Sequence, residues 1–359
     1  MSALSPRIPP RLRAYSHVAR ARIRMDKTRP ALPRATHLVI TWRCNLQCGT
    51  CGVWKRDSST ELSPSDWSRV FAQLRSLDIV KIIGGEPFAR EDLGDVVQVI
   101  RREVNPLVVQ LVTNATMTDD VVRFAEKHAW PGLHLRISLD GMEKVHDHSR
   151  GHPGAFRAAM ETMESLSRLR GKRRRFGPGA SRWFQIGVNF ILNDESLEDM
   201  TPLAERCKQL GVDLIPGFAV RPFLRHSDLS QEVVSTVGVT QPAKMLGRLA
   251  VDDHGARSGF NGIEQFFLRA ANKVVFRKQA RGGEALRFHC RELRDLMYLL
   301  PNGDLITCGL NHEPLGNLAT GSFEELWYGD RARQFRERVD SCQGCMQGAV
   351  EIMSRIYGG

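Results

Sequence analysis

The sequence contains no long hydrophobic run and few aromatic residues. No segment approaches the roughly eighteen consecutive apolar residues of a membrane-spanning helix, and the amino-terminal region has no apolar core of a secretion signal. Only 7% of the residues are aromatic, and no base-stacking aromatic motif of a known nucleic-acid module is present. These absences argue against an integral membrane protein, a secreted protein and a dedicated nucleic-acid reader.

Acidic residues are scarce in two stretches of a chain whose formal net charge is +11. Residues 7–34 carry eight arginines and Lys27 against one acid, Asp26, and residues 168–175 form a second basic run. Such runs are typical of solvated surface segments. An organelle transit peptide or a helix lying on a membrane surface remains an alternative for the first run. We interpret residues 1–35 as a basic arm outside the catalytic core.

Cysteine is the residue around which the chemistry concentrates. Eight cysteines without a secretion signal indicate metal or redox chemistry in a reducing cytoplasm rather than disulfides. Cys44, Cys48 and Cys51 follow an apolar run, residues 37–42, at C-x3-C-x2-C spacing. Iron–sulfur clusters normally take four cysteines, so three leave one iron open to bind another molecule. A zinc knuckle is the competing interpretation.

From Thr36 onward, apolar strand-length runs alternate with amphipathic helix-length stretches, which predicts an α/β fold with a parallel sheet. The predicted strands are residues 37–42, 79–83, 107–112, 133–139, 183–192 and 213–220, and the predicted helices are 63–77, 91–103, 118–128, 154–169 and 197–210. Six such units are too few for a closed eight-stranded barrel, so we expect an open partial barrel with its site at the carboxyl ends of the strands. Residues 221–285 are predicted to form a helical linker without functional signal.

Motifs at these strand ends resemble those of the radical S-adenosylmethionine (radical SAM) superfamily. Besides the cysteine loop, the chain has Gly84-Gly85-Glu86-Pro87 after the second strand and Ser138-Leu139-Asp140-Gly141 after the fourth. The resemblance implies a partial (β/α)6 TIM-like barrel over residues 36–220. It also implies a SAM-binding 4Fe-4S cluster on Cys44, Cys48 and Cys51, and reductive cleavage of S-adenosylmethionine to a 5′-deoxyadenosyl radical.

The same resemblance implies where the cosubstrate binds. The family's GGEP motif holds the methionine amino group, the serine at the end of the fourth strand contacts the cosubstrate, and an arginine pairs with its carboxylate through two parallel hydrogen bonds. The contacts implied in this sequence are Gly84, Gly85, Glu86, Thr113, Asn114, Ser138, Arg150 and Asn189. One departure is Thr50, which stands where the family usually has an aromatic residue near the adenine.

A second cysteine set lies in the carboxyl-terminal region. It consists of Cys290, Cys308, Cys342 and Cys345. A hairpin is predicted around residues 298–307, and the segments 315–318 and 322–327 resemble SPASM and Twitch domains. We therefore expect an auxiliary iron–sulfur domain over residues 286–359, with a second 4Fe-4S cluster on these four cysteines. The absence of further cysteines after Cys345 favours the Twitch arrangement, and a zinc site stays open as the alternative.

The sequence thus predicts a cytoplasmic radical SAM oxidoreductase that abstracts hydrogen from a C–H bond of a small molecule. A maturase acting on a ribosomally made peptide and an epimerase are alternatives within the family, and a zinc-stabilised nucleic-acid binder is the remote alternative outside it. A short basic arm is unlike a leader-binding domain, which favours the small molecule. The chemistry also requires a one-electron reductant such as flavodoxin or ferredoxin.

Overall fold

The computed structural model describes residues 30–49, 51–174, 184–192, 195–218, 292–309 and 313–339. Most of the basic arm, the linker 221–285 and Thr50 lie outside these residues, as do Cys290, Cys342 and Cys345, and the second basic run is described up to Arg174. Within the described part, no helix is both long and apolar enough to cross a membrane.

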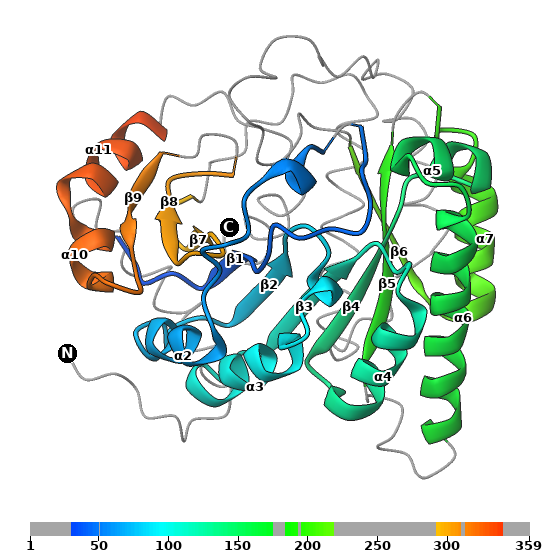
Figure 1. Ribbon diagram of the computed structural model, residues 1–359, viewed down its shortest axis with the longest axis horizontal. Coiled ribbons are helices and arrows are strands. Elements are labelled where there is room, and N and C mark those ends of the chain that lie inside the picture. Colours follow the sequence, from blue (N-terminus) through cyan, green and yellow to red (C-terminus); the bar gives the residue numbers. More distant parts are fainter. Residues whose placement is uncertain are drawn as a thin grey trace.

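Six parallel strands form the centre of the fold (Figure 1). They are β1 (Ala35–Val39), β2 (Ile79–Ile83), β3 (Val108–Thr113), β4 (Leu133–Leu139), β5 (Gln185–Leu192) and β6 (Asp213–Phe218). Each pairs in register with its predecessor along the chain, so the strand order is simply sequential. The sheet does not close, which confirms the predicted open partial barrel.

Helices cover one face of this sheet. They are α2 (Pro64–Ala72), α3 (Leu93–Glu103), α4 (Thr118–His128), α5 (Glu143–Arg150), α6 (Ala155–Arg174) and α7 (Met200–Leu210). The largest apolar cluster lies between them and the sheet, and it includes Leu38, Ile82, Leu111 and Leu135 from alternate strand positions. The residues between those positions therefore line the opposite, inner face of the barrel.

Local sequence explains where these helices begin and end. Ser63 caps α2: its Oγ accepts a hydrogen bond from the Asp66 amide, and the Asp66 carboxylate accepts one from the Ser63 amide. Pro64 occupies the first helical position. Helix α5 was not predicted as a separate element, because seven of its eight residues are polar and its one buried side chain is His146, so it has no apolar periodicity.

The carboxyl-terminal hairpin continues the same sheet. Strand β7 (Leu296–Leu299) pairs parallel with β1, and β8 (Asp304–Ile306) and β9 (Pro314–Asn317) follow antiparallel, so the sheet has nine strands in the order β6-β5-β4-β3-β2-β1-β7-β8-β9. The hairpin itself was predicted, but its place beside β1 was not. Cys308 lies two residues after β8, and β7 separates β8 from β1 in the sheet.

Two short helices, α10 (Phe323–Tyr328) and α11 (Asp330–Val339), anchor this extension to the barrel. The Gln73 side chain, just after α2, donates to the Leu318 carbonyl at 3.1 Å and accepts from the Phe323 amide at 2.9 Å. The Trp327 indole donates to the Ala31 carbonyl at 3.1 Å. The hairpin and its helices are thus packed against α2 and the residues before β1.

Candidate active site

The cysteine loop leaves the end of β1 and is held there by a buried carboxylate that sequence analysis missed. Glu61 Oε1 accepts hydrogen bonds from Thr41 Oγ1 and from the Trp42 amide, each at 2.7 Å. Its other oxygen pairs with the Arg43 guanidinium at 2.8 Å. No pattern around Glu61 distinguishes it from a surface acid in the sequence, because its partners lie about twenty residues away.

Gly84 and Gly85 let the end of β2 lie directly against this loop. The Gly85 amide donates to the Thr41 carbonyl and the Glu86 amide to the Arg43 carbonyl, both at 2.8 Å. A Cβ on Gly84 would stand 2.5 Å from the Thr41 carbonyl oxygen, and one on Gly85 would stand 2.1 Å from that of Arg43. Only glycine fits this approach, and Gly84 also has a φ of 149°, which disfavours other residues.

Replacing Gly85 with alanine should therefore push β2 away from the cysteine loop. Backbone atoms, unlike flexible side chains, cannot give way cheaply, so we expect a loss of about 1–3 kcal/mol in the free energy of unfolding and poor cluster loading. Gly171→Ala is the matched control, because nothing lies within 4 Å of its Cβ position in α6. That control should be neutral or slightly stabilising. Thermal unfolding and iron content measure both effects, and equal behaviour of the two variants would contradict this reading of the contact.

Glu86 ties together the ends of β2 and β3. Its carboxylate accepts hydrogen bonds from Thr113 Oγ1 at 2.8 Å, from the Asn114 amide at 2.7 Å and from the Phe88 amide at 3.2 Å. It is 1% exposed, and burial raises its pKa to about 7 against the opposing effect of these hydrogen bonds and of Arg150. Its side chain is therefore already engaged in positioning Thr113 and Asn114.

Asn114 extends this network to the cysteine loop. Its side-chain amide donates to Asn45 Oδ1 at 2.9 Å, and its own oxygen accepts from the Thr116 amide and hydroxyl at 2.9 and 2.7 Å. Asn45 stands between Cys44 and Leu46, so the end of β3 fixes the loop from a second side. Asn45 is a further residue that sequence analysis did not single out.

Arg150, at the end of α5, lies between a carboxylate and the cysteines. Its Nε is 2.9 Å from Asp140 Oδ2, its Nη2 donates to Asp140 Oδ1 at 3.1 Å, and Ser149 Oγ donates to Asp140 Oδ2 at 2.8 Å. Burial lowers the pKa of Arg150, but the negative charge of Asp140 and the interaction with Cys48 outweigh this effect and raise it. The guanidinium thus places a positive charge beside the thiols.

Ser138 and Asn189 are the two predicted site residues that keep their polar groups free. They are direct neighbours across β4 and β5, and both are partly exposed on the inner face of the barrel. Within the described part of the chain, neither side chain forms a hydrogen bond, in contrast to Glu86, Thr113 and Asn114. The structure thus brings all eight predicted cosubstrate residues to one end of the sheet. The side chains of Glu86, Thr113 and Asn114 already form hydrogen bonds with other described residues, whereas those of Ser138 and Asn189 do not.

The three thiols of the loop fit an iron–sulfur cluster. All three cysteines are free and partly buried, and the Cys51 amide donates to the Cys48 carbonyl at 3.2 Å, which closes a turn between the last two. Among the described residues, no three His, Cys, Asp or Glu side chains converge on a single metal ion. A cubane cluster takes one thiolate on each of three irons, so its ligands need not converge on one point.

Burial governs the protonation of these thiols. It raises the pKa of Cys44 to about 11 and raises that of Cys51, and the neighbouring thiols add to the effect on Cys44. Without metal, both side chains are therefore protonated at neutral pH. Because ligating thiols must be deprotonated, binding of a cluster releases protons from the loop.

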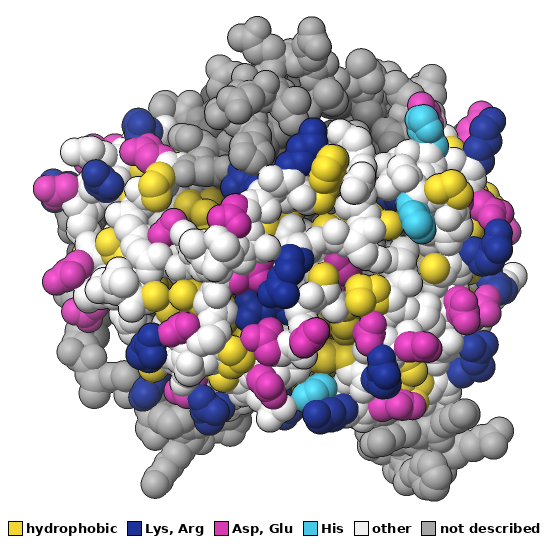
Figure 2. All heavy atoms as spheres, viewed as in Figure 1, with side chains coloured by type: hydrophobic (Ala, Val, Ile, Leu, Met, Phe, Trp, Pro, Cys, Tyr) yellow, Lys and Arg dark blue, Asp and Glu magenta, His cyan; other side chains and the backbone are white. Residues whose placement is uncertain are grey.

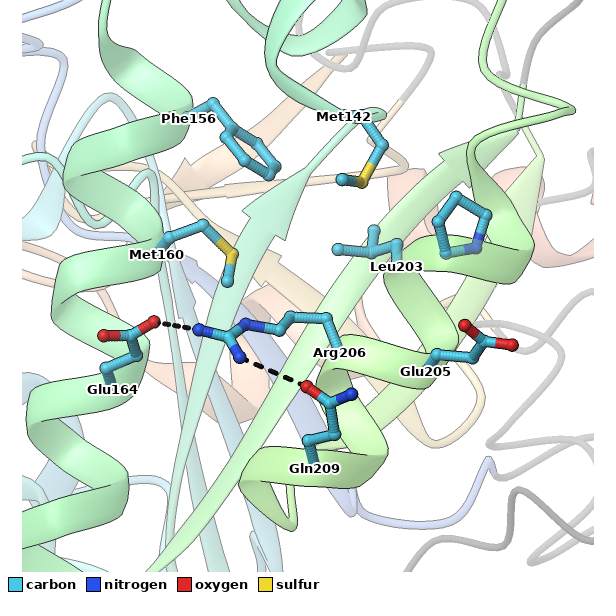
Figure 3. Close-up of a pocket in the computed structure, with 9 residues that line it drawn as sticks. Met142, Phe156, Met160, Glu164, Leu203, Glu205, Arg206 and Gln209 are labelled. Carbon is cyan, nitrogen blue, oxygen red and sulfur yellow. Dashed lines mark hydrogen bonds and ion pairs between the residues drawn. The ribbon is translucent and has the colours of Figure 1, made fainter.

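A surface hollow among the described residues lies elsewhere. Met142, Phe156, Met160 and Leu203 line its floor, and Arg206 crosses its rim to pair with Glu164 (Figure 3). Its volume is about 400 Å³, and it lies between α6 and α7, on the helical side of the sheet. None of the cysteines, Glu86 or Arg150 lines it, so it is not part of the thiol site.

Comparison with known proteins agrees with this geometry. The family model of the radical SAM superfamily matches residues 38–204, and that of the SPASM iron–sulfur cluster-binding domain matches residues 290–346. The chain belongs to the radical SAM superfamily. A radical SAM domain implies a 4Fe-4S cluster with S-adenosylmethionine at the barrel, and a SPASM domain implies auxiliary iron–sulfur clusters.

Similar proteins of this superfamily differ in their named reactions. The AdoMet-dependent heme synthase of Methanosarcina barkeri is 26% identical over 331 residues, covering 86% of this chain and 85% of that protein. The PqqA peptide cyclase of Bradyrhizobium diazoefficiens is 32% identical over 187 residues, covering 51% of this chain and 45% of that protein. The chain spans less than half the length of several curated relatives.

Solved radical SAM structures share the fold. Streptococcus suis SuiB bound to its precursor peptide SuiA superposes with a TM-score of 0.60 at 16% identity, covering 93% of this chain and 73% of SuiB. At this level of identity the likeness concerns the fold alone. It includes most of the chain, in keeping with a barrel and a carboxyl-terminal extension built on one sheet.

Proposed function

We propose that this radical SAM enzyme abstracts hydrogen from a C–H bond of a small molecule and oxidises it. The observation that carries the proposal is the meeting of three free thiols, a guanidinium and the ends of β2 to β5 at one edge of an open sheet. Alignment with a heme synthase along 86% of this chain supports a small-molecule substrate. Partial alignment with a peptide cyclase supports a peptide as the second candidate.

Cys44, Cys48 and Cys51 would hold the cluster of the barrel, with Arg150 offsetting the negative charge of its thiolates. When bound, this cluster and S-adenosylmethionine supply a 5′-deoxyadenosyl radical. Glu86, Thr113 and Asn114 would act by positioning the loop, since their polar groups already bond one another and Asn45. The backbone carbonyl groups of Gly84 and Gly85 would accept hydrogen bonds from the methionine ammonium group.

Ser138 and Asn189 would bind the cosubstrate directly, because their polar groups are free on the inner face. Truncation of either to alanine should therefore raise the Kd for S-adenosylmethionine up to about tenfold, equivalent to about 1.4 kcal/mol for one hydrogen bond. Anaerobic calorimetric titration of the reconstituted enzyme measures this. Gln209→Ala, on the helical side of the sheet, should leave the Kd unchanged. Unchanged Kd values for both variants would show that Ser138 and Asn189 do not bind the cosubstrate.

The four cysteines of the second set would hold an auxiliary 4Fe-4S cluster that accepts the second electron of the oxidation. Cys308 is the described member, half-buried after β8 and close to β1 in the sheet order. A flavodoxin or ferredoxin would supply the first electron. The cytoplasm is the compartment in which such reductants and free thiols coexist.

Product mass distinguishes the candidate reactions. Anaerobic turnover with metabolites and peptides encoded near the gene should give a small-molecule product two hydrogens lighter than its substrate, together with 5′-deoxyadenosine. A product with the same mass as its substrate would show that the reaction is an epimerisation or a rearrangement rather than an oxidation. Modification of a peptide alone would establish the second candidate instead.

A further inference from the structure

A continuous row of polar side chains crosses the inner face of the barrel. In register across six strands it runs Tyr298, His37, Lys81, Gln110, His134 and Gln185, and we call it the lumen row. The adjacent positions along each strand face the helices and are apolar except for Thr36. Burying a polar side chain removes its hydration and costs free energy unless it gains a hydrogen-bond partner. A row of such residues inside the barrel therefore indicates a binding role.

Arg136 stands one row nearer the cysteine end than the lumen row. It pairs in register with Gly187 on β5, which in turn pairs with Asp213 on β6. A Cβ on Gly187 would lie 1.8 Å from Arg136 Nη1, so the guanidinium extends across the glycine toward Asp213. The side chain thus lies flat on the inner face rather than reaching solvent.

Neither Arg136 nor Lys81 forms an ion pair within the described part of the chain. Arg136 is 7% exposed, and its Nε and Nη1 are buried without a hydrogen-bond partner. Lys81 is partly exposed to the inner face, and its row neighbours His37 and Gln110 offer no negative charge. By contrast, the outer face in Figure 2 shows positive and negative side chains interspersed over the helices.

The two positive charges affect their surroundings. Burial and the nearby Arg136 lower the pKa of Lys81 to about 8, and burial lowers that of Arg136 to about 10 against the attraction of Asp213. Burial, with Arg136, also lowers the pKa of His134 to about 3, so this histidine is neutral. Both cations are charged at neutral pH, and Asp213 offsets one of them.

We propose that Lys81 and Arg136 form an anion subsite inside the barrel that binds a carboxylate or phosphate group of the substrate. A guanidinium offers two parallel donors to such a group, and an ammonium adds a point charge. This inference rests on the proposed function, which places the substrate on the inner face next to the cosubstrate.

The position of the subsite suits that role. Strand residues rise about 3.3 Å each, so Arg136 lies about 7 Å below Ser138 and the Lys81 row about 13 Å below it. An anionic group held there leaves room for a small molecule to extend toward the cosubstrate. Its reacting C–H bond would then face the cysteine end of the sheet.

Neutral variants of the two cations test the subsite directly. The probes are citrate and inorganic phosphate, titrated calorimetrically into the anaerobic, cluster-loaded full chain with S-adenosylmethionine present. Whichever probe binds the wild type, Lys81→Met and Arg136→Met should each raise its Kd by at least tenfold. Lys208→Met on the exposed side of α7 and Arg123→Met on α4 remove equal charges from the outer surface and should change it less than twofold.

A third variant removes space instead of charge. Gly187→Ala leaves every charged group in place but occupies the position of the Arg136 guanidinium, so it should weaken anion binding as Arg136→Met does. It also separates loss of anion binding from the effect of removing the positive charge near Asp213. Thermal unfolding identifies any variant that is not folded, and Lys81→Met, which removes no ion pair or hydrogen bond among the described residues, then decides the matter.

Three outcomes would overturn the subsite: no binding of either probe to the wild type, equal binding in the inner and outer variants, or loss of S-adenosylmethionine affinity in the inner variants. The last result would assign the cations to the carboxylate of the cosubstrate. The proposed function fails by a different measurement: the wild type would then form no 5′-deoxyadenosine. Anion binding is measured without turnover, so the two failures can be told apart.

Discussion

Replacing Cys44, Cys48 and Cys51 together with alanine should abolish formation of 5′-deoxyadenosine and remove about four irons and four sulfides per chain. The reason is that these three thiols lie on one short loop, with Arg150 beside Cys48 and Cys51, and the other described cysteines, Cys207 and Cys308, lie on other elements. Iron and sulfide analysis with the absorbance near ~400 nm measures the loss of the cluster. Product analysis after reduction with dithionite measures the loss of cleavage.

Cys207→Ala is the matched control for this triple variant. Cys207 is 1% exposed on α7 and packs in the main apolar cluster, so its loss should cost about 1 kcal/mol of stability without affecting iron or cleavage. Cleavage that survives in the triple variant would contradict the assignment of the barrel cluster. Loss of iron in Cys207→Ala would mean that the two sets of thiols are not independent.

The second large effect is expected at the auxiliary cysteines. A Cys308→Ala, Cys345→Ala double variant should keep the barrel cluster and part of its 5′-deoxyadenosine formation while losing the oxidised product. A cluster with cysteine on all four irons has no open position for substrate, so electron transfer is its remaining task, and the hydrogen bonds and burial around its sulfurs tune its potential. Iron analysis, 5′-deoxyadenosine and product are measured in the same samples.

Normal amounts of oxidised product from this double variant would reduce the second set to a structural clamp. Zinc at these cysteines would have the same meaning, and metal analysis of the wild type detects it directly. The barrel should fold in either case, because β7 pairs with β1 and β8 pairs with β7, and the two strands bury Leu296, Tyr298 and Ile306.

Periodicity was sufficient to predict the barrel strands and most helices. Strands β2 and β4 were predicted at their observed bounds, since apolar β-branched runs bounded by turns identify buried strands. The place of β7 beside β1 could not be predicted, because pairing between strands about 260 residues apart leaves no local signal.

The inner face was partly readable in the sequence. Strand β4 alternates strictly as L-H-L-R-I-S-L, which usually means one face in the core and one in water. Here the polar face turns into the barrel instead. Lys81 in the apolar run I-V-K-I-I gave the same signal. Glu61 and Asn45 gave none, since their importance lies in tertiary contacts with residues at other strand ends.

The central claim is that the end of this sheet performs radical SAM chemistry. It is tested most directly by incubating the anaerobically reconstituted wild-type chain with S-adenosylmethionine and dithionite and measuring 5′-deoxyadenosine and methionine by mass spectrometry. Both should accumulate in equal amounts, well above those of the Cys44, Cys48, Cys51 triple alanine variant. Accumulation no greater than in that variant, from wild-type protein with its full iron content, would contradict the account.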